Sequence, residues 1–185
     1  MKRLLLGISG GPGAGKSTFA ARLAGELAAA GVTAAVVPMD GFHLPDAVLA
    51  ERGLADVKGA PETFDRPALE ELLSQLRDTS RTVLAPAYSR DLHAVVPDAI
   101  AIEPDVQIVI VEGNYLGLWP GVRAALDEIW KLELPWETAR ERLIARRVAT
   151  GRDPEAAAAW VDRVDAANAM LVADSYATRV ITDAG

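Results

Sequence analysis

A glycine-rich segment near the N-terminus constrains the fold more than any other feature of this sequence. Residues 10–17 read Gly-Gly-Pro-Gly-Ala-Gly-Lys-Ser, which satisfies the Walker A phosphate-binding spacing at every position. An apolar, strand-like run at residues 3–9 precedes it, and a helical pattern at residues 16–30 follows and ends at Gly31. Backbone N–H groups of such a loop and the helix N-terminus together hold phosphate oxygens. The sequence therefore predicts an α/β fold built around a nucleotide site.

The residues of this loop have separate expected roles. Lys16 is expected to bridge the terminal phosphates of a nucleotide and to act in catalysis, and Ser17 to ligate Mg²⁺ through its hydroxyl. The residues expected to contact the nucleotide are Gly10, Gly11, Gly13, Ala14, Gly15, Lys16, Ser17 and Thr18. A plain glycine-rich turn between strand and helix is the alternative, and the complete motif in its expected context argues against it.

Short apolar strands alternate with longer helical patterns along the rest of the chain, which is typical of parallel β-α units. Strands are expected at residues 3–9, 33–39, 106–111, 128–134 and 179–182, and helices at 16–30, 67–77, 119–126, 135–149 and 154–175. Two β-prone pieces, 82–85 and 99–102, predict a small β-ribbon. Residues 40–66 lack periodicity and predict a long functional loop with a short helix. We expect one domain over residues 1–185, with a five-stranded parallel sheet flanked by helices.

Composition excludes several classes of function. The chain has 19 basic and 26 acidic residues, a net charge of −7, which disfavours nucleic acid or an anionic membrane as a partner. It has no cysteine and two histidines, which excludes disulfides and thiolate chemistry and leaves little for a zinc centre. No stretch approaches the ~18 apolar residues of a membrane span. We expect a cytoplasmic protein, and the sequence leaves a homodimer open.

Two of the expected strands end in carboxylates. Residues 36–39 run into Asp40, and residues 108–111 run into Glu112. Ligands of an open parallel sheet bind beyond the carboxyl ends of its strands, so both side chains should lie near the phosphate loop. We assign Asp40 to an acceptor hydroxyl, as general base or orienting group, and Glu112 to Mg²⁺ or its waters. A turn residue and a polar strand end are the plainer alternatives.

Several segments together resemble a known family. Beside the phosphate loop, they are Met-Asp-Gly-Phe-His at 39–43, Pro-Glu-Thr-Phe-Asp at 61–65 and Glu-Gly-Asn-Tyr at 112–115. This combination, which covers most of the chain, resembles the uridine kinase, phosphoribulokinase and pantothenate kinase family of P-loop kinases. It is most similar to small bacterial nucleoside/nucleotide kinase-like proteins, often provisionally named fructose transport system kinases. The resemblance implies ATP-dependent transfer to a hydroxyl of a small metabolite, on a sheet with strand order 2-3-1-4-5.

The resemblance also implies residues that hold the acceptor. Asp65 falls where related kinases hold this molecule, and the N-terminal cap of the following helix is an equal alternative. Tyr88 and Arg90 resemble the pair that lines the acceptor pocket in uridine kinase-like enzymes. His43 would fall at the mouth of that pocket, with a solvated loop histidine as the alternative. His93 is given no function.

A helix rich in arginine resembles the lid of these kinases, where arginines neutralise the transferring phosphoryl group. Its arginines are Arg140, Arg142, Arg146 and Arg147, and Arg152 follows in the next turn. On a helical wheel, Arg147 shares a face with Leu143, whereas Arg142 and Arg146 project away, so Arg147 is the expected catalytic arginine. Arg152 could reach the nucleotide on closure. A solvated basic face is the alternative. The lid would span about residues 136–153, and the acceptor segments 40–66 and 82–104.

The leading hypothesis is a Mg²⁺- and ATP-dependent kinase of a small hydroxylated metabolite, such as a nucleoside, a sugar, or a pantothenate-like or glycerate-like molecule. The alternative is a regulatory P-loop ATPase that acts through a protein partner. Asp-Val-Lys-Gly at 56–59 matches the DxxG string of GTPase switches. No expected strand leads into it and the chain has no guanine motif, so we attribute this match to chance. The sequence does not identify the acceptor or distinguish ATP from GTP.

Overall fold

The centre of the molecule is a parallel β-sheet of five strands, seen in a computed structural model that describes residues 2–89, 92 and 94–182. Its strands are β1 (Leu4–Gly10), β2 (Ala34–Pro38), β5 (Ile108–Glu112), β6 (Glu128–Leu132) and β7 (Arg179–Ile181). They lie in the order β2-β5-β1-β6-β7, and every neighbouring pair is parallel. Counted along the chain within this sheet, the order is 2-3-1-4-5. The expected sheet and its strand order are therefore confirmed.

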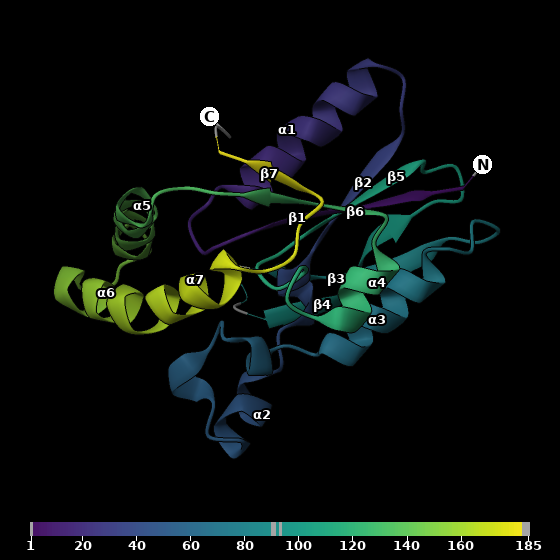
Figure 1. Ribbon diagram of the computed structural model, residues 1–185. Helices are drawn as coiled ribbons and strands as arrows, with labels where there is room; N and C mark the ends of the chain where they lie inside the picture. The colour runs from purple at the N-terminus through teal and green to yellow at the C-terminus, as the bar shows by residue number, and fades with distance from the viewer. Residues whose placement is uncertain (1, 90–91, 93, 183–185) are drawn as a thin grey trace.

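Helices cover both faces of this sheet (Figure 1). The helices in the described residues are α1 (Lys16–Ala29), α2 (Asp46–Glu51), α3 (Arg66–Gln75), α4 (Pro120–Ala125), α5 (Trp136–Ala149), α6 (Pro154–Trp160) and α7 (Ala166–Ala173). On one face, Phe19 of α1 packs with Ile8 and Ile110 of the sheet. On the other, Leu69 of α3 and Val122 of α4 close a larger apolar core. Because both faces are covered, the strands read as nearly continuous apolar runs. No helix in the described part of the chain is long and apolar enough to cross a membrane.

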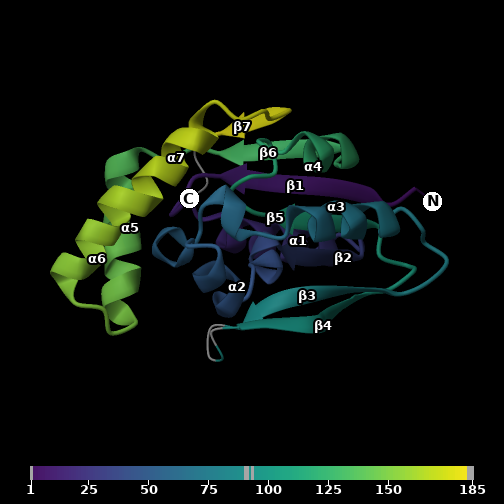
Figure 2. The same ribbon diagram turned by 90° about the horizontal axis from the view of Figure 1, so that it is seen from below.

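A β-hairpin lies outside the main sheet. Strands β3 (Val83–Ser89) and β4 (Ala94–Ile102) pair antiparallel and form a two-stranded sheet of their own, which Figure 2 shows running alongside the rest of the molecule. The register shifts between Ala85 and Ala87, at a proline that has no N–H to donate. The expected β-ribbon is thus present, with both strands longer than the sequence pattern indicated.

The segment between β2 and α3 is a long connection with little regular structure, as expected. It contains the 3-10 turns η1 (Met39–Phe42), η2 (Ala55–Val57) and η3 (Pro61–Thr63), with the short helix α2 between the first two. Its two ends lie side by side, because Asp65 donates its backbone N–H to the Phe42 carbonyl and Leu44 donates to Thr63. The segment is therefore a closed loop that returns to the end of β2.

The last helical region differs from the single helix expected over residues 154–175. It begins as predicted, because Asp153 caps α6 by accepting from the Ala156 backbone N–H at 3.0 Å. A π-helical turn, Val161–Asp165, then separates α6 from α7. A π turn adds one residue to the helical repeat and so changes which side chains face inward, here burying the Asp165 side chain. Helices α5, α6 and α7 together form one end of the molecule (Figure 1).

Asp127, at the start of β6, holds the amino-terminal edge of the sheet together. Its carboxylate accepts from the Leu5 backbone N–H at 2.8 Å, from Arg77 Nη1 at 2.7 Å and from Lys2 Nζ at 2.9 Å. Burial favours the neutral acid, but these donors outweigh it and lower the pKa of Asp127 to about 2. The carboxylate therefore stays charged at neutral pH and stabilises the fold through charge-assisted hydrogen bonds.

We expect Asp127→Asn to lower the free energy of unfolding at neutral pH by roughly 1–2 kcal/mol, because charge-assisted hydrogen bonds are lost. The folded-state pKa lies below the ordinary value, so this stabilisation is present above that value and is lost as the pH falls toward about 2. Urea unfolding of both proteins at neutral and acidic pH measures the difference. Asp174→Asn, at an exposed site, is the control. If the difference in unfolding free energy between the parent chain and Asp127→Asn increased as the pH was lowered, this assignment would be contradicted.

Candidate active site

The phosphate loop connects β1 to α1 in a tight turn. Gly13 and Gly15 have φ angles of 79° and 85°, in the left-handed region that favours glycine. A Cβ on Gly13 would also lie 2.9 Å from the Ala139 carbonyl of α5, so this glycine allows the helix to pack on the loop. Lys16 reaches back over the loop and donates from Nζ to the Gly11 carbonyl at 2.9 Å. The glycines that the motif requires therefore occupy positions where a side chain would strain or block the loop.

Glu112 lies directly beside the phosphate loop. It pairs with Ile8 in the register between β5 and β1, two residues before the loop begins. Its side chain is buried, and Ser17 Oγ donates to its Oε1 at 2.8 Å. The hydroxyl and the carboxylate assigned from sequence to one metal therefore touch each other in the structure.

The Lys16 ammonium lies among charges of both signs. Burial lowers the pKa of Lys16, and the positive charge of Arg146 acts in the same direction, whereas the carboxylates of Glu112 and Asp40 oppose the shift. These influences require all three partners to lie within electrostatic reach of the ammonium. The structure thus gathers Lys16, Glu112 and Asp40 around one loop, as the ends of the strands predicted.

Asp40 follows β2 within the turn η1. Pro38 pairs with Glu112 in the register between β2 and β5, so Asp40 lies two residues beyond the same edge of the sheet. The residue is exposed, and its carbonyl accepts from the backbone N–H of His43 at 3.3 Å and contacts His43 Nδ1 at 3.0 Å. The backbone holds the imidazole close to Asp40, while the Asp40 carboxylate remains accessible.

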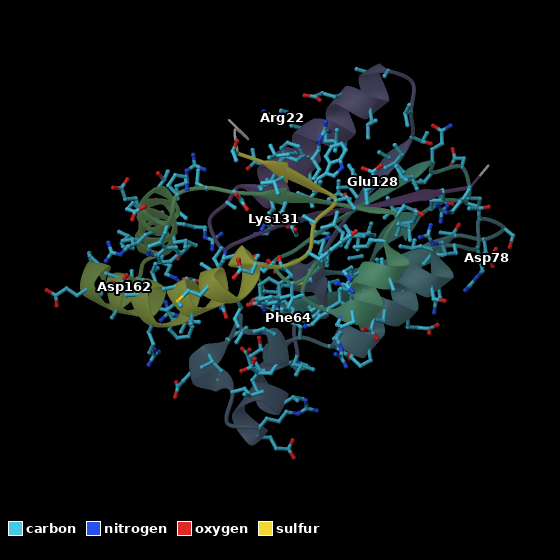
Figure 3. All side chains as sticks on the ribbon, viewed as in Figure 1. Arg22, Phe64, Asp78, Glu128, Lys131 and Asp162 are labelled. Atoms are coloured by element: carbon cyan, nitrogen blue, oxygen red, sulfur yellow. The ribbon has the colours of Figure 1, made fainter. Side chains whose placement is uncertain are left out.

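Aromatic and charged side chains surround His43. Its ring lies 4.0 Å from the Phe64 ring and 5.5 Å from the Tyr88 ring, measured between centroids. Figure 3 shows Phe64 between the sheet and the segment that carries α2. Burial lowers the pKa of His43 despite the opposing carboxylate of Asp40, so the imidazole is neutral at neutral pH. The sequence-assigned His43 and Tyr88 are therefore brought together beside Asp40.

Lys58 and Asp46 complete this group, and we name Asp40, His43, Asp46, Lys58 and Tyr88 the Asp40 cluster. Lys58 Nζ donates to Asp46 Oδ1 at 2.6 Å and lies 5.5 Å from the centroid of the Tyr88 ring. Its charge also acts on His43. Sequence reasoning missed Lys58, because the string that contains it matched only an unrelated motif.

The arginine-rich helix α5 packs the face predicted by the helical wheel on the phosphate loop, because Leu143 lies 3.1 Å from the position of a Cβ on Gly13. Arg142 Nη1 lies 4.0 Å from the position of a Cβ on Gly15, and the charge of Arg146 acts on Lys16. Arg147 turns toward the π-helical turn, where Nη2 donates to Asp165 Oδ2 at 3.0 Å. Arg142 and Arg146 are exposed, as the wheel predicted, but both lie near the loop, which the wheel did not predict. The wheel identifies the buried side of a helix, but not which neighbour lies against each flank.

The other sequence-assigned residues have mixed outcomes. Asp65 caps α3, because its side chain accepts from the Ala68 backbone N–H at 3.1 Å, so the structural alternative is realised. Thr18 follows the loop on α1 and is exposed, and Arg152 is exposed after the end of α5. Arg90 and His93 lie outside the described residues.

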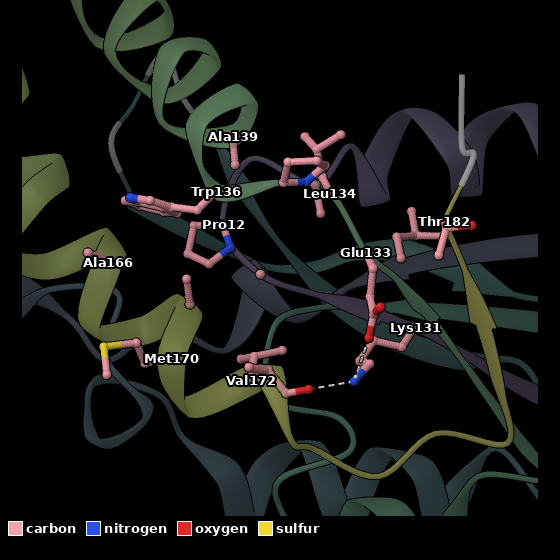
Figure 4. Close-up of a pocket in the computed structure, with 16 residues that line it drawn as sticks. Pro12, Lys131, Glu133, Leu134, Trp136, Ala139, Ala166, Met170, Val172 and Thr182 are labelled. Atoms are coloured by element: carbon pink, nitrogen blue, oxygen red, sulfur yellow. Dashed lines mark hydrogen bonds and ion pairs between the residues drawn. The ribbon is translucent and has the colours of Figure 1, made fainter.

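A mainly apolar cavity of about 760 Å³ lies against the outer side of the phosphate loop (Figure 4). Pro12 of the loop, Trp136 at the start of α5 and Met170 of α7 form its walls, and Thr182 lies at its edge. The lining also includes Lys131, whose Nζ donates to the Ala173 carbonyl at 2.6 Å and pairs with Glu133. The cavity has the size and apolar lining of a small-molecule site.

Gly41, next to Asp40, fixes the hairpin against η1, because a Cβ there would overlap the Pro86 carbonyl of β3. We expect Gly41→Ala to cost roughly 1–3 kcal/mol of stability, since backbone must move to relieve the overlap. Gly25→Ala is the control, because no atom approaches that position on α1 and alanine favours a helix by up to about 1 kcal/mol. Thermal and urea unfolding measure both. Equal stability of Gly41→Ala and the parent chain would contradict the assigned contact.

Known proteins resemble this chain in sequence and in fold. A model of the phosphoribulokinase/uridine kinase family matches residues 5–153. YggC of Escherichia coli K12, whose function is uncharacterised, is 36% identical over 181 residues, 92% of this chain and 73% of that protein. The ATP-dependent kinase-like protein notR' of Aspergillus versicolor is 38% identical over 135 residues, 65% of this chain and 77% of that protein.

A crystal structure from Silicibacter sp. TM1040, provisionally named a fructose transport system kinase, superposes with a TM-score of 0.90. It is 38% identical and covers 97% of this chain and 90% of that chain. A five-stranded parallel sheet in this order, with a Walker A loop after its central strand, gives the chain a P-loop kinase-like fold. The chain belongs to the phosphoribulokinase/uridine kinase family. Membership implies ATP as the phosphoryl donor.

Proposed function

We propose that this protein transfers the γ-phosphoryl group of ATP, with Mg²⁺, to a hydroxyl of a small metabolite. The observation that carries the proposal is the position of Lys16, which lies over the phosphate loop and within electrostatic reach of Glu112 and Asp40. Phosphoryl transfer needs phosphate alignment, charge neutralisation and a proton acceptor, and these residue types supply all three. The arrangement thus supports transfer to an acceptor more directly than it supports a nucleotide switch.

The residues beside the loop fit a magnesium ion. Ser17 Oγ and Glu112 Oε1, which lie 2.8 Å apart, are the hard oxygen ligands that Mg²⁺ prefers. Among the residues that the structure describes, no group of three or more His, Asp or Glu side chains forms a metal site. Mg²⁺ fits such a site because it takes few protein ligands and completes its shell with phosphate oxygens and water. When bound, it neutralises charge on the β- and γ-phosphates.

Asp40 is the group that receives the acceptor proton. Its exposed carboxylate lies beyond the end of β2, at the edge of the sheet where the γ-phosphate would be held. As the new oxygen–phosphorus bond forms, the hydroxyl proton passes to Asp40 and the bond between the γ-phosphorus and the bridging oxygen breaks, which leaves ADP. His43, neutral and held by the Asp40 carbonyl, and Tyr88 would orient the acceptor.

Arginines of α5 would neutralise charge on the transferring group. Arg142 lies beside Gly15 of the loop, and Arg146 lies within electrostatic reach of Lys16. Arg147 would act only after release from Asp165, and Arg152 only after a movement of the turn that follows α5. The apolar cavity beside Pro12 and Trp136 would seat the nucleotide base.

Acceptor-dependent ADP formation tests this function. We expect ADP formation from MgATP to be slow when water is the only acceptor. The rate should increase when one class of compound is added, among nucleosides, sugars, hydroxyacids and their phosphates. Nucleotide binding, measured by calorimetry, is the companion measurement. Binding of MgATP with hydrolysis stimulated only by a protein partner would replace the proposal with a regulatory ATPase.

A further inference from the structure

Lys58, like its partner Asp46, is a member of the Asp40 cluster for which phosphoryl transfer to a neutral hydroxyl has no use. Its ammonium lies between the Tyr88 ring, 5.5 Å from the centroid, and Asp46, 2.6 Å from Oδ1. The Lys58 side chain is 28% exposed and the Asp46 side chain 71% exposed. The cation therefore lies on the inner side of this pair and the carboxylate on the solvent side.

Buried side chains hold the backbone at this position in place. The carbonyl of Gly59, the next residue, accepts from Tyr115 Oη at 2.5 Å and from Asn168 Nδ2 at 3.2 Å. The Gly59 N–H donates to Thr63 Oγ1 at 3.0 Å. Tyr115, Asn168 and Thr63 are all buried, and they come from three separate parts of the fold. The fold therefore fixes the backbone from which the Lys58 side chain extends.

The partner that Lys58 has in this structure is a weak one. Asp46 is mostly exposed, and an exposed ion pair contributes little because water competes for both charges. An anionic group bound to Lys58 in place of Asp46, beside Tyr88, would lose more of its water and would gain a stronger charge-assisted hydrogen bond. Burial favours the neutral amine, but Asp46 and Tyr88 together raise the pKa of Lys58, so the side chain is charged at neutral pH.

We propose that the phosphate acceptor is an anion, a small hydroxylated carboxylate or phosphate ester, and that Lys58 is the residue that recognises its charged group in place of Asp46. This inference rests on the proposed kinase function and specifies its substrate class. The reacting hydroxyl lies at Asp40 and the anionic group at Lys58.

The opposite charges of Asp40 and Lys58 set the orientation of such an acceptor. Both residues lie within electrostatic reach of His43, so they belong to one site. The negative charge of Asp40 repels the anionic end and the positive charge of Lys58 attracts it. An anionic acceptor would thus enter with its hydroxyl, and not its charged group, toward the phosphate loop.

Matched pairs of probes test the proposal on the intact chain. The pairs are glycerate with glycerol, pantothenate with pantothenol, and ribose 5-phosphate with ribose, so that the first two pairs test carboxylates and the third tests a phosphate ester. Affinity is measured by calorimetry and ligand-observed NMR without nucleotide, and kcat/KM by ADP formation. We expect the parent chain to bind the anionic member of at least one pair at least about tenfold more tightly than its neutral counterpart.

Substitutions then assign the preference to a residue. Lys58→Gln is expected to weaken binding of the anionic probe roughly 10- to 100-fold and to leave the neutral probe unchanged, while Lys58→Arg retains most of the preference. Asp46→Asn, which removes the competing carboxylate, is expected to make the anionic probe bind more tightly. Glu51→Gln, an exposed change at the end of α2, is the control.

Three results would overturn the inference: equal or tighter binding of the neutral members, no detectable binding of any anionic probe, or a preference that survives in Lys58→Gln. None of these depends on turnover, because the affinities are measured without ATP. Failure of the kinase function would instead appear as absent MgATP binding, or as acceptor binding without ADP formation. The two failures are therefore distinguishable.

Discussion

Lys16→Ala is expected to reduce kcat for acceptor phosphorylation by roughly 100- to 1,000-fold, because it removes the cation that faces the charge developing on the phosphates. It should also weaken MgATP binding, measured by calorimetry. Burial already lowers the pKa of Lys16, which means that the fold incurs a cost to hold this charge. The variant should therefore unfold at the same temperature as the parent chain or higher.

If Lys16→Ala loses activity while its stability is retained or increased, the loss of activity is not caused by unfolding. Arg22→Ala is the matched control, because it removes a positive charge from an exposed position on the same helix α1. It should leave MgATP affinity unchanged. Full activity of Lys16→Ala would refute the assignment of the phosphate site.

Asp40→Asn is the second large expected effect, a decrease in kcat of roughly 100- to 10,000-fold. The amide has nearly the same shape as the carboxylate but does not accept the hydroxyl proton. Because Asp40 is exposed and its backbone contacts with His43 do not involve the carboxylate, folding and MgATP binding should be retained. Steady-state kinetics with saturating acceptor measure kcat, and calorimetry measures MgATP binding.

Asp56→Asn, an exposed change in η2 of the same connecting segment, is the control and should leave kcat unchanged. Acceptor-dependent turnover that Asp40→Asn leaves intact would remove Asp40 from the proton-accepting role. A decrease in MgATP affinity alone would instead place this carboxylate on the metal side of the site.

The parts of the fold predictable from sequence are those governed by local rules. The Walker A spacing indicated a strand, a loop and a helix, and β1, Gly13 and α1 follow that pattern. Strand ends also located Asp40 and Glu112, because parallel strands direct their carboxyl ends to one edge of the sheet. The strand order came from family resemblance, since no local pattern specifies which strands are neighbours.

The parts that sequence did not predict depend on contacts between distant segments. The neighbour that the buried face of α5 meets is the phosphate loop, through the packing of Ala139 against Gly13, which periodicity within α5 does not reveal. The π-helical turn changes the side of the helix that carries Asp165, and no propensity signal marks it. The hydrogen bonds that anchor Gly59 come from distant parts of the chain. Tyr115 lies 56 positions away in the sequence and Asn168 lies 109 positions away.

The hairpin β3–β4 has its own hydrogen-bond ladder, separate from the main sheet. Tyr88 lies on this hairpin, and His43 and Lys58 lie on the connection between β2 and α3, whereas Lys16 and Glu112 belong to the sheet and its loop. Under the proposed function, the hairpin and the connection would therefore carry the recognition of the acceptor, and their residues can change without breaking a bond of the central ladder. A chimera with the hairpin and the connection of one relative on the sheet of another is expected to bind the acceptor of the donor and to keep the phosphate loop of the host, provided that Asp40 is retained.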